Sequence, residues 1–326
     1  MKFLITGEKK PENEYDLVII GGGPAGCTAG LYAGRFRIKT LIIANDFGGL
    51  INDAEVVDNY PGIPDVKGSE LGKKFLEHAK KYGIETYLDE VIDIKKENKF
   101  FKIITTKNEI KAKAIILATG EKHRKLGVPG EKELTGKGVS YCAICDAPLF
   151  KGKEVAIVGG GNASFTEAQI LAKHAKKVYL IHRRNWFRAD PIEVERVKKI
   201  ENIEIKTPYV IKEIKGNDKV EYLVLKKTRE GNGKVVETDE TKKLKVDGLF
   251  IAVGLIPKSE LAKKIGVKLN EKGYVIVDDY MKTNVEGVFA AGDLTDKASK
   301  FRQIVLAAAQ GAIAAYSAFE FLKRLD

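Results

Sequence analysis

Short apolar stretches that run into glycine recur along the 326-residue chain and dominate its hydrophobic pattern. Residues 15–20 lead into Gly-x-Gly-x-x-Gly at 21–26, and residues 155–158 lead into Gly-x-Gly-x-x-Ser at 159–164. A stretch rich in small residues follows each loop, as expected for a helix packed closely against the preceding strand. The pattern therefore predicts a strand–glycine loop–helix unit in each half of the chain.

A later apolar stretch that ends in glycine occurs in each half, at residues 114–120 and 248–254. The stretch GVFAAGD, at 287–293, occurs only once and comes after both halves. A simple tandem repeat would carry this closing strand twice, so the single late copy predicts that the second domain is nested inside the first. The expected boundaries are 1–121 and 250–326 for the first domain, and 122–249 for the second.

Two further segments alternate between apolar and polar residues. They span residues 204–228 in the second half and residues 96–113 at the matching place in the first half. This period of two predicts a small antiparallel sheet in each domain. We therefore expect an α/β fold made of two nested Rossmann-like nucleotide-binding domains of the three-layer ββα type.

Composition narrows the class of protein. Apolar residues make up 44% and charged residues 31% of the chain, which is the profile of a folded, soluble protein. The chain has no uninterrupted run of about 18 apolar residues and no secretory signal, so we expect no membrane span and a cytoplasmic location. The formal net charge of +11 comes from lysines scattered among acids, which favours a solvated surface over a nucleic-acid site.

The end of the second strand distinguishes the ligands of the two domains. A dinucleotide site for NAD usually has an acid at this place, whereas NADP needs cations for its 2′-phosphate. The second domain has His182, Arg183 and Arg184 there, followed by Arg188. Arginine's planar fork matches phosphate oxygens, so this cluster predicts NADPH binding rather than a merely basic surface loop.

The chain contains three cysteines: Cys27, Cys142 and Cys145. A structural zinc site would need four ligands, which the Cys142-x-x-Cys145 pair does not supply. Two inert core thiols are a second reading, although Asp146 is a poor neighbour for a buried core. A redox dithiol fits the spacing best. Cys27 lies on the first predicted helix and is expected to be a small core residue.

Six motifs look, in order, like those of low-molecular-weight thioredoxin reductases. They are GGGPAG at 21–26, NYPG at 59–62, ATG at 118–120, CAICD at 142–146, HRR at 182–184 with FRA at 187–189, and AGD at 291–293 followed by RQ at 302–303. The chain resembles this family over nearly its whole length. The resemblance implies FAD in the first domain, NADPH in the second, a homodimer, and a redox disulfide between Cys142 and Cys145. We expect thioredoxin or a glutaredoxin-like protein as partner, and a peroxide-reducing system would also be chemically acceptable.

The resemblance and the chemistry of the side chains together place the cofactors. The expected FAD contacts are Gly21, Gly23, Pro24, Ala25, Gly26, Asp46, Gly48, Gly49, Leu50, Asn59, Val91, Ala118, Thr119, Gly120, Gly292, Asp293, Arg302, Gln303 and Ile304. The expected NADPH contacts are Gly161, Asn162, Ala163, Ser164, His182, Arg183, Arg184 and Arg188. Asp293 suits a ribityl hydroxyl, and Gln303 with the amide of Ile304 suits the N1–O2 edge of the flavin. No metal site is expected.

Three features depart from the family pattern. Leu50 stands where the family usually has glutamine, and it cannot make an amide's hydrogen bonds. Residues 147–148 read Ala-Pro in place of the common Gly-Phe after Asp146. The loop before Arg302 is longer by about two residues than in the bacterial pattern.

The resemblance also implies a mechanism. Electrons pass from NADPH to the flavin, then to the disulfide, and the resulting dithiol reduces a partner's disulfide. We expect catalytic roles for Cys142, Cys145 and Asp146, with Cys145 nearer the flavin and Asp146 as general acid. Which cysteine forms the mixed disulfide stays open at this point. A rotation of the nested domain, hinged near 120–123 and 247–251, would present nicotinamide and disulfide to the flavin in turn.

Three alternative functions would each be expected to give a different sequence pattern. A relative that uses ferredoxin or a deazaflavin as electron donor would lack the arginine cluster at 182–184. A ferredoxin–NADP reductase would lack the pair Cys142 and Cys145. A nucleic-acid or scaffold protein on a retired nucleotide fold would have no need of intact glycine fingerprints in both domains.

Overall fold

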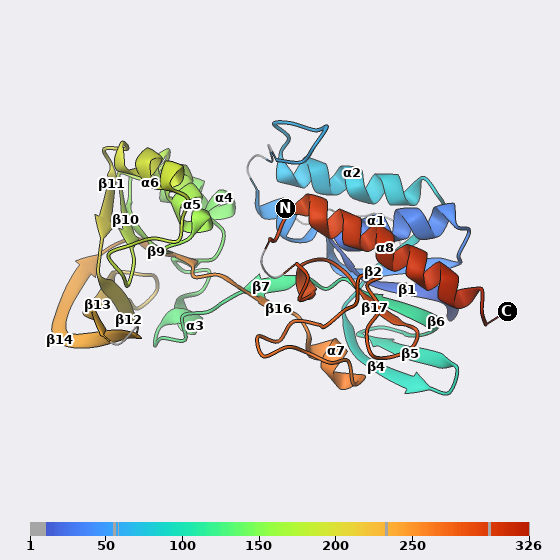
Figure 1. Ribbon diagram of the computed structural model, residues 1–326. Coiled ribbons are helices and arrows are strands. Elements are labelled where there is room, and N and C mark those ends of the chain that lie inside the picture. Colours follow the sequence, from blue (N-terminus) through green and yellow to red (C-terminus); the bar gives the residue numbers. More distant parts are fainter. Residues whose placement is uncertain (1–10, 55–56, 58, 232–233, 299–300, 326) are drawn as a thin grey trace. The chain divides into compact units, whose positions relative to one another are not determined.

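The computed structural model describes residues 11–54, 57, 59–231, 234–298 and 301–325 (Figure 1). The chain divides into two compact units. Unit 1 combines Met1–Lys122 with Ile256–Asp326, and unit 2 is the single segment His123–Leu255. The contiguous unit 2 is thus inserted into the discontinuous unit 1.

The sheet of unit 1 has a parallel part and an antiparallel part. Its parallel strands lie in the order β3-β2-β1-β6, β17 also pairs with β6, and β5 and β4 continue the sheet in antiparallel pairing. The central strand β1 is apolar almost throughout because both faces of a largely parallel sheet are covered. The bounds are β1 (Glu14–Gly22), β2 (Thr40–Phe47), β3 (Glu85–Leu88), β4 (Val91–Glu97), β5 (Phe100–Thr105), β6 (Glu109–Leu117) and β17 (Val288–Ala290).

Helices α1 (Pro24–Arg35) and α8 (Ile304–Leu322) lie side by side in unit 1 (Figure 1). Small residues let them approach closely, since a Cβ at Gly311 would lie 2.2 Å from the carbonyl oxygen of Ala25. By length and composition alone, α8 could cross a membrane. Its buried residues, such as Ala314, instead belong to the hydrophobic core of unit 1.

Unit 2 has three layers. Its parallel sheet has the order β11-β10-β9-β15-β8, and a separate antiparallel sheet has the order β12-β13-β14. Val155 and Ile157 of β9 share a cluster with Phe165 of α5, whereas Ala156 and Val158 share another with residues of β12 and β13. Successive side chains of a strand point to opposite faces, so helices cover one face and the antiparallel sheet covers the other. The bounds are β8 (Val139–Ser140), β9 (Glu154–Gly159), α5 (Asn162–Ala172), β10 (Lys177–Ile181), α6 (Pro191–Lys198), β11 (Ile203–Lys206), β12 (Tyr209–Lys215), β13 (Tyr222–Gly231), β14 (Lys234–Lys245) and β15 (Gly248–Ala252).

The antiparallel sheet expected in unit 2 is confirmed as β12 and β13 with β14, although residues 204–206 of the expected segment belong to the parallel strand β11. In unit 1 the expected segment also pairs in antiparallel fashion, as β4 and β5 with β6, but it continues the large sheet and does not form a separate one. The remaining elements are short, apart from α2. They are η1 (Gly49–Asp53), α2 (Gly68–Lys80), α3 (Glu131–Leu134), α4 (Ala143–Asp146), η2 (Ala147–Phe150), α7 (Glu260–Lys264) and η3 (Gly292–Leu294).

The chain passes between the units twice, through β7 (Glu121–His123) and β16 (Leu255–Pro257), which pair with each other. The boundary expected between residues 249 and 250 would cut β15. In the structure β15 stays within unit 2 because it pairs along its whole length with β9, and the second crossing follows it at Leu255.

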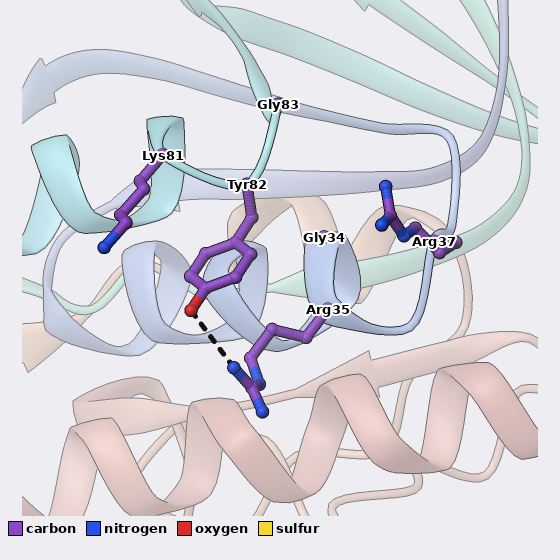
Figure 2. A pocket seen from close by; sticks show the side chains of 6 residues that line it. All are labelled: Gly34, Arg35, Arg37, Lys81, Tyr82 and Gly83. Atoms are coloured by element: carbon purple, nitrogen blue, oxygen red, sulfur yellow. Dashed lines mark hydrogen bonds between the residues drawn. The ribbon is translucent and has the colours of Figure 1, made fainter.

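A cavity of about 500 Å³ lies where α1 and α2 end (Figure 2), lined by Gly34, Arg35, Arg37, Lys81, Tyr82 and Gly83. Nη1 of Arg35 donates a hydrogen bond to the Tyr82 hydroxyl at 3.1 Å. Carbonyl groups at a helix C-terminus carry partial negative charge, which favours cations there. The positive charge of this cavity is therefore explained by the two helix ends it adjoins.

The contact between α1 and α8 generates a prediction about stability. Gly311→Ala should lower the free energy of unfolding by about 1–3 kcal/mol, because the added methyl meets backbone at Ala25 and forces the helices apart. Urea unfolding measures the change. Ala309→Ser, at an exposed position of the same helix, should change it by less than about 0.5 kcal/mol. Equal effects of the two substitutions would contradict the packing argument.

Candidate functional site

The first glycine loop joins β1 to α1 and is shaped by close backbone contacts. Gly21 has φ +120°, and a Cβ there would lie 2.1 Å from the carbonyl oxygen of Ala118. A Cβ at Gly26 would lie 1.9 Å from the carbonyl oxygen of Gly21. Only glycine fits at both positions. The loop leads directly into α1, whose first residue is Pro24, and the N–H groups of a helix N-terminus favour a phosphate.

Two other expected segments meet this loop. The amide of Gly48 donates to the carbonyl of Gly22 at 2.8 Å, and the amide of Ala118 donates to the carbonyl of Ile20 at 2.8 Å. The segments 48–50 and 118–120 therefore gather beside the first glycine loop, at the carboxyl ends of β2 and β6. Such an edge of an open α/β sheet is where ligands bind.

Asn59 and Gln303 also come together. Nδ2 of Asn59 donates to Oε1 of Gln303 at 2.9 Å, which joins residues that lie far apart in the chain. Oδ1 of Asp293 is buried and has no hydrogen-bond partner among the described residues. Burial raises the pKa of Asp293, with Arg302 opposing the shift. A buried carboxylate oxygen without a donor fits a ligand that brings a hydroxyl group, as a ribityl chain does.

The structure gives the following surroundings for four of the expected FAD residues. Asp46 is exposed and accepts a hydrogen bond from Nδ2 of Asn52 at 3.4 Å. Val91 is buried in the hydrophobic core at the start of β4. The hydroxyl of Thr119 donates to the carbonyl of Lys258 at 2.7 Å, so its side chain is engaged in unit 1. Leu50 is half-buried within η1.

The second glycine loop, in unit 2, holds the arginine segment against itself. The carbonyl of Gly160 accepts the amide of Arg188 at 2.8 Å, and a Cβ at Gly160 would lie 2.3 Å from the His182 ring. Burial, with Arg183 and its neighbours, lowers the pKa of His182 to about 4. His182 is therefore neutral near pH 7 and packs against the loop, so the arginines supply the positive charge.

The arginines present their charge beside this loop. Arg183 and Arg188 are exposed, and the guanidinium carbon of Arg184 lies 4.9 Å from the centroid of the Trp186 ring. Nε of Arg184 lies 3.7 Å from Oε1 of Glu230, an exposed acid on β13. Three guanidinium groups outnumber the nearby carboxylates of Glu230 and Asp190, which leaves a net positive site that suits a phosphate.

The start of α5 is held from both sides. Asn162 and Asp190 exchange two hydrogen bonds, at 2.9 Å from Nδ2 of Asn162 to Oδ2 of Asp190, and at 2.7 Å from the Asp190 amide to Oδ1 of Asn162. The buried Ser164 hydroxyl donates to the carbonyl of Gly161 at 2.7 Å. Ala163 lies between them in the first turn. These contacts keep the loop backbone and the helix N-terminus in place.

Cys142 and Cys145 form a disulfide, with Cα atoms 5.4 Å apart. The pair follows β8, and the glycine loop at Gly160 follows β9, while β15 pairs in parallel with both strands. The disulfide and the nucleotide loop therefore share one edge of the unit 2 sheet. Cys27 is buried in the core of unit 1, where burial raises the pKa of its thiol to about 12, as expected for an inert thiol.

Sequence reasoning missed a buried carboxylate beside the disulfide. Glu131 accepts the Tyr141 hydroxyl at 2.6 Å and the amides of Leu126 at 3.0 Å and Gly127 at 2.6 Å. Burial acts to raise the pKa of Glu131, but these hydrogen bonds lower it overall. Tyr141 directly precedes Cys142, so the contact anchors the redox segment.

A second missed group lies in unit 1. Glu121 is buried, and its carboxylate contacts Tyr274 and Arg302. The sequence does indicate this group, because Glu121 follows the buried strand β6 and Gly120 directly, and a buried charge at such a place needs a partner.

Comparison with known proteins agrees with this geometry. A family model described as pyridine nucleotide-disulphide oxidoreductase matches residues 15–311. The thioredoxin reductase of Bacillus subtilis (strain 168) is 43% identical over 323 residues, which are 97% of this chain and 97% of that protein. The solved thioredoxin reductase of Lactococcus lactis, in its FR conformation, matches with a TM-score of 0.87 at 40% identity, over 95% of this chain and 99% of its own. That of T. acidophilum matches with a TM-score of 0.85 at 38% identity, over 97% and 100%.

The chain belongs to the thioredoxin reductase family. The expected family and fold, with two Rossmann-like nucleotide-binding domains, are thereby confirmed. As a member of this family, the chain is a flavoprotein oxidoreductase that uses a flavin and a pyridine nucleotide.

The environment of His182 predicts a pH dependence of stability. Its pKa is about 4 in the folded protein and 6.5 without the surrounding structure, so the unfolded state binds more protons between these values. The free energy of unfolding contributed by His182 is therefore fully present above about pH 6.5 and is lost as pH falls to about 4. Chemical unfolding of His182→Gln across this window should show a shallower decline than the unsubstituted protein. Identical slopes would exclude His182 as the cause.

Proposed function

We propose that the chain reduces a protein disulfide, that of thioredoxin or a glutaredoxin-like protein, with NADPH as electron donor and FAD as carrier. The observation that carries the proposal is the placement of the Cys142–Cys145 disulfide on the same sheet edge as the arginine-bordered nucleotide loop. A dithiol–disulfide centre of this kind serves electron transfer.

The residues present in unit 1 fit FAD. The first glycine loop would hold the pyrophosphate at the start of α1, and the unpartnered oxygen of Asp293 would accept a ribityl hydroxyl. Gln303, held by Asn59, would meet the N1–O2 edge together with the amide of Ile304. When bound, FAD supplies two-electron transfer between a nicotinamide hydride and a disulfide.

The residues of unit 2 fit NADPH. The loop at 160–164 would hold the pyrophosphate, and Arg183, Arg184 and Arg188 would bind the 2′-phosphate. This cluster disfavours the alternative in which ferredoxin or a deazaflavin is the electron donor, because neither carries a 2′-phosphate for the arginines to bind.

The cysteines carry out the exchange chemistry. Two electrons and two protons convert the Cys142–Cys145 disulfide into two thiols. One thiolate attacks the partner's disulfide, forms a mixed disulfide and releases a partner thiolate; the second then attacks the mixed disulfide, restores Cys142–Cys145 and releases the other. Cys145 is exposed, and its amide donates to Sγ of Cys142 at 3.2 Å, which favours negative charge on that sulfur. Asp146, half-buried next to Cys145, would protonate the leaving thiolate.

The proposal includes a homodimer and a cytoplasmic location. Tyr32 of α1 and Ile313 and Tyr316 of α8 are exposed apolar side chains on neighbouring helices, which a second copy in a homodimer would cover. A cytoplasmic location fits a disulfide that is catalytic rather than structural. Rotation at β7 and β16 would present nicotinamide and disulfide to the flavin in turn. The second hinge is moved from the expected residues 247–251 to β16, because residues 248–252 form strand β15 within unit 2.

The order of electron transfer predicts how cysteine variants behave. The purified protein should be yellow, and NADPH should bleach its flavin without oxygen present. Cys142→Ser and Cys145→Ser should each abolish reduction of thioredoxin while leaving this bleaching intact, because the dithiol acts after the flavin. Cys27→Ala, which removes the buried thiol, should keep both half-reactions. Stopped-flow absorbance and an insulin-coupled thioredoxin assay separate them, and equal loss of both in the Cys142 or Cys145 variants would sink the assignment.

The arginine cluster predicts cofactor choice. Charge-assisted hydrogen bonds contribute roughly 1.5–3 kcal/mol each, and about 1.4 kcal/mol is tenfold. Replacing Arg183 and Arg184 together by glutamine should therefore lower kcat/KM for NADPH by about a hundredfold or more, with little change for NADH. Replacing the exposed Lys212 and Lys234 by glutamine removes the same charge elsewhere in unit 2 and should affect neither cofactor. A parallel loss for both cofactors would remove the arginines from the phosphate site.

A further inference from the structure

An acid that no motif accounts for lies at the point where the chain leaves unit 1. Glu121 follows Gly120 at the start of β7, and its side chain has 0% exposure. Oε1 accepts the Tyr274 hydroxyl at 2.7 Å and lies 3.0 Å from Nε of Arg302. Oε2 is buried and has no hydrogen-bond partner among the described residues.

The charge of Glu121 depends on these two contacts. A buried carboxylate is costly unless a cation and hydrogen bonds compensate it. Burial raises the pKa of Glu121 and the nearby Asp293 adds to this rise, while Tyr274 and Arg302 act to keep the carboxylate charged. Arg302 also donates a hydrogen bond to the Tyr274 hydroxyl, so the three side chains form one closed network.

The network joins three segments that are distant in the chain. Glu121 belongs to the crossing strand β7, Tyr274 precedes the short bridge at Val275, and Arg302 directly precedes Gln303 and the start of α8. Of the three, Arg302 alone reaches solvent appreciably, with 37% of its side chain exposed against 0% for Glu121. The buried carboxylate of Glu121 therefore restrains the partly exposed side chain of Arg302.

We propose that Glu121 is a positioning residue that acts through Tyr274 and Arg302 to fix residues 302–304 against the flavin and to balance the charge of Arg302 there. This role rests on the FAD site proposed above. Negative charge grows on the N1–O2 edge when the flavin is reduced, so the net charge of the adjoining side chains sets how readily reduction occurs. Glu121 and Arg302 oppose each other's charge there, and the Asp293 carboxylate interacts electrostatically with both.

Glu121→Gln tests the charge directly, because it keeps the size of the side chain and removes its charge. Arg302 is partly exposed and can be hydrated, so the variant retains its fold. Loss of the Glu121 charge leaves Asp293 as the carboxylate that still opposes Arg302, so the site becomes more positive. This change should favour the reduced flavin and shift the midpoint potential of bound FAD to a more positive value. Tyr274→Phe keeps both charges but breaks the network, and it should speed FAD dissociation several-fold.

The matched control is Glu85→Gln. Glu85 on β3 accepts the Tyr15 hydroxyl at 2.8 Å, so this variant also removes a carboxylate from a tyrosine–carboxylate pair of unit 1, away from the segment 302–304. Three quantities are measured on FAD-loaded protein: the midpoint potential by anaerobic spectroscopic titration, the rate of FAD release by flavin fluorescence, and the Tm. The control should leave the potential and the release rate unchanged.

Two outcomes overturn the positioning role. The first is a Glu121→Gln variant with the potential and FAD release rate of the unsubstituted protein, even if its Tm is lower, since a merely structural role changes stability alone. The second is an equal shift in Glu85→Gln. Bleaching of the unsubstituted protein by NADPH is scored separately, so a failure of the proposed function itself is seen there and not in the variants.

Discussion

The parallel pairing of β15 with both β8 and β9 determines where the chemistry of unit 2 takes place. Carboxyl ends of parallel strands meet at one edge of a sheet, so the residues that follow β8 and β9 are brought to the same edge. Cys142 follows one strand and Gly160 follows the other. The cysteine pair and the second glycine loop, which are separate along the sequence, therefore lie at the same edge of the sheet. Strand pairing brings them together, and no contact between sequence neighbours is needed.

Much of this arrangement is predictable because its causes are local. The glycine fingerprints, the apolar strands and the arginines after β10 each leave a short-range pattern that is tied to a backbone or charge requirement. The network of Glu121, Tyr274 and Arg302 leaves no such pattern. Glu121 lies 153 residues before Tyr274, on the other side of the inserted unit, and only the return of the chain to unit 1 brings it beside Tyr274 and Arg302.

Burial changes the role of residues whose chemical type is evident from the sequence. His182 belongs to a cationic motif by sequence, yet its position on Gly160 and beside three arginines makes it neutral and structural. A similar point holds for α8, where no uninterrupted apolar run marks the helix. Its isoleucine, valine, leucine, phenylalanine and alanine residues give it enough apolar character to cross a membrane by length and composition, while small residues such as Gly311 allow its close contact with α1.

The departure at Leu50 can be compared with the amide pair of Asn59 and Gln303, which also belongs to the proposed flavin site. Leu50 lacks the hydrogen-bonding groups of the glutamine usual in the family, while Asn59 donates to the oxygen of Gln303. Because that oxygen is engaged, the NH₂ group of Gln303 is the end left to donate. A donor is what the N1–O2 edge of a flavin requires as negative charge grows there. The polar requirement of the proposed flavin site is thus met from the segment that begins α8, the same segment that Glu121 holds through Arg302.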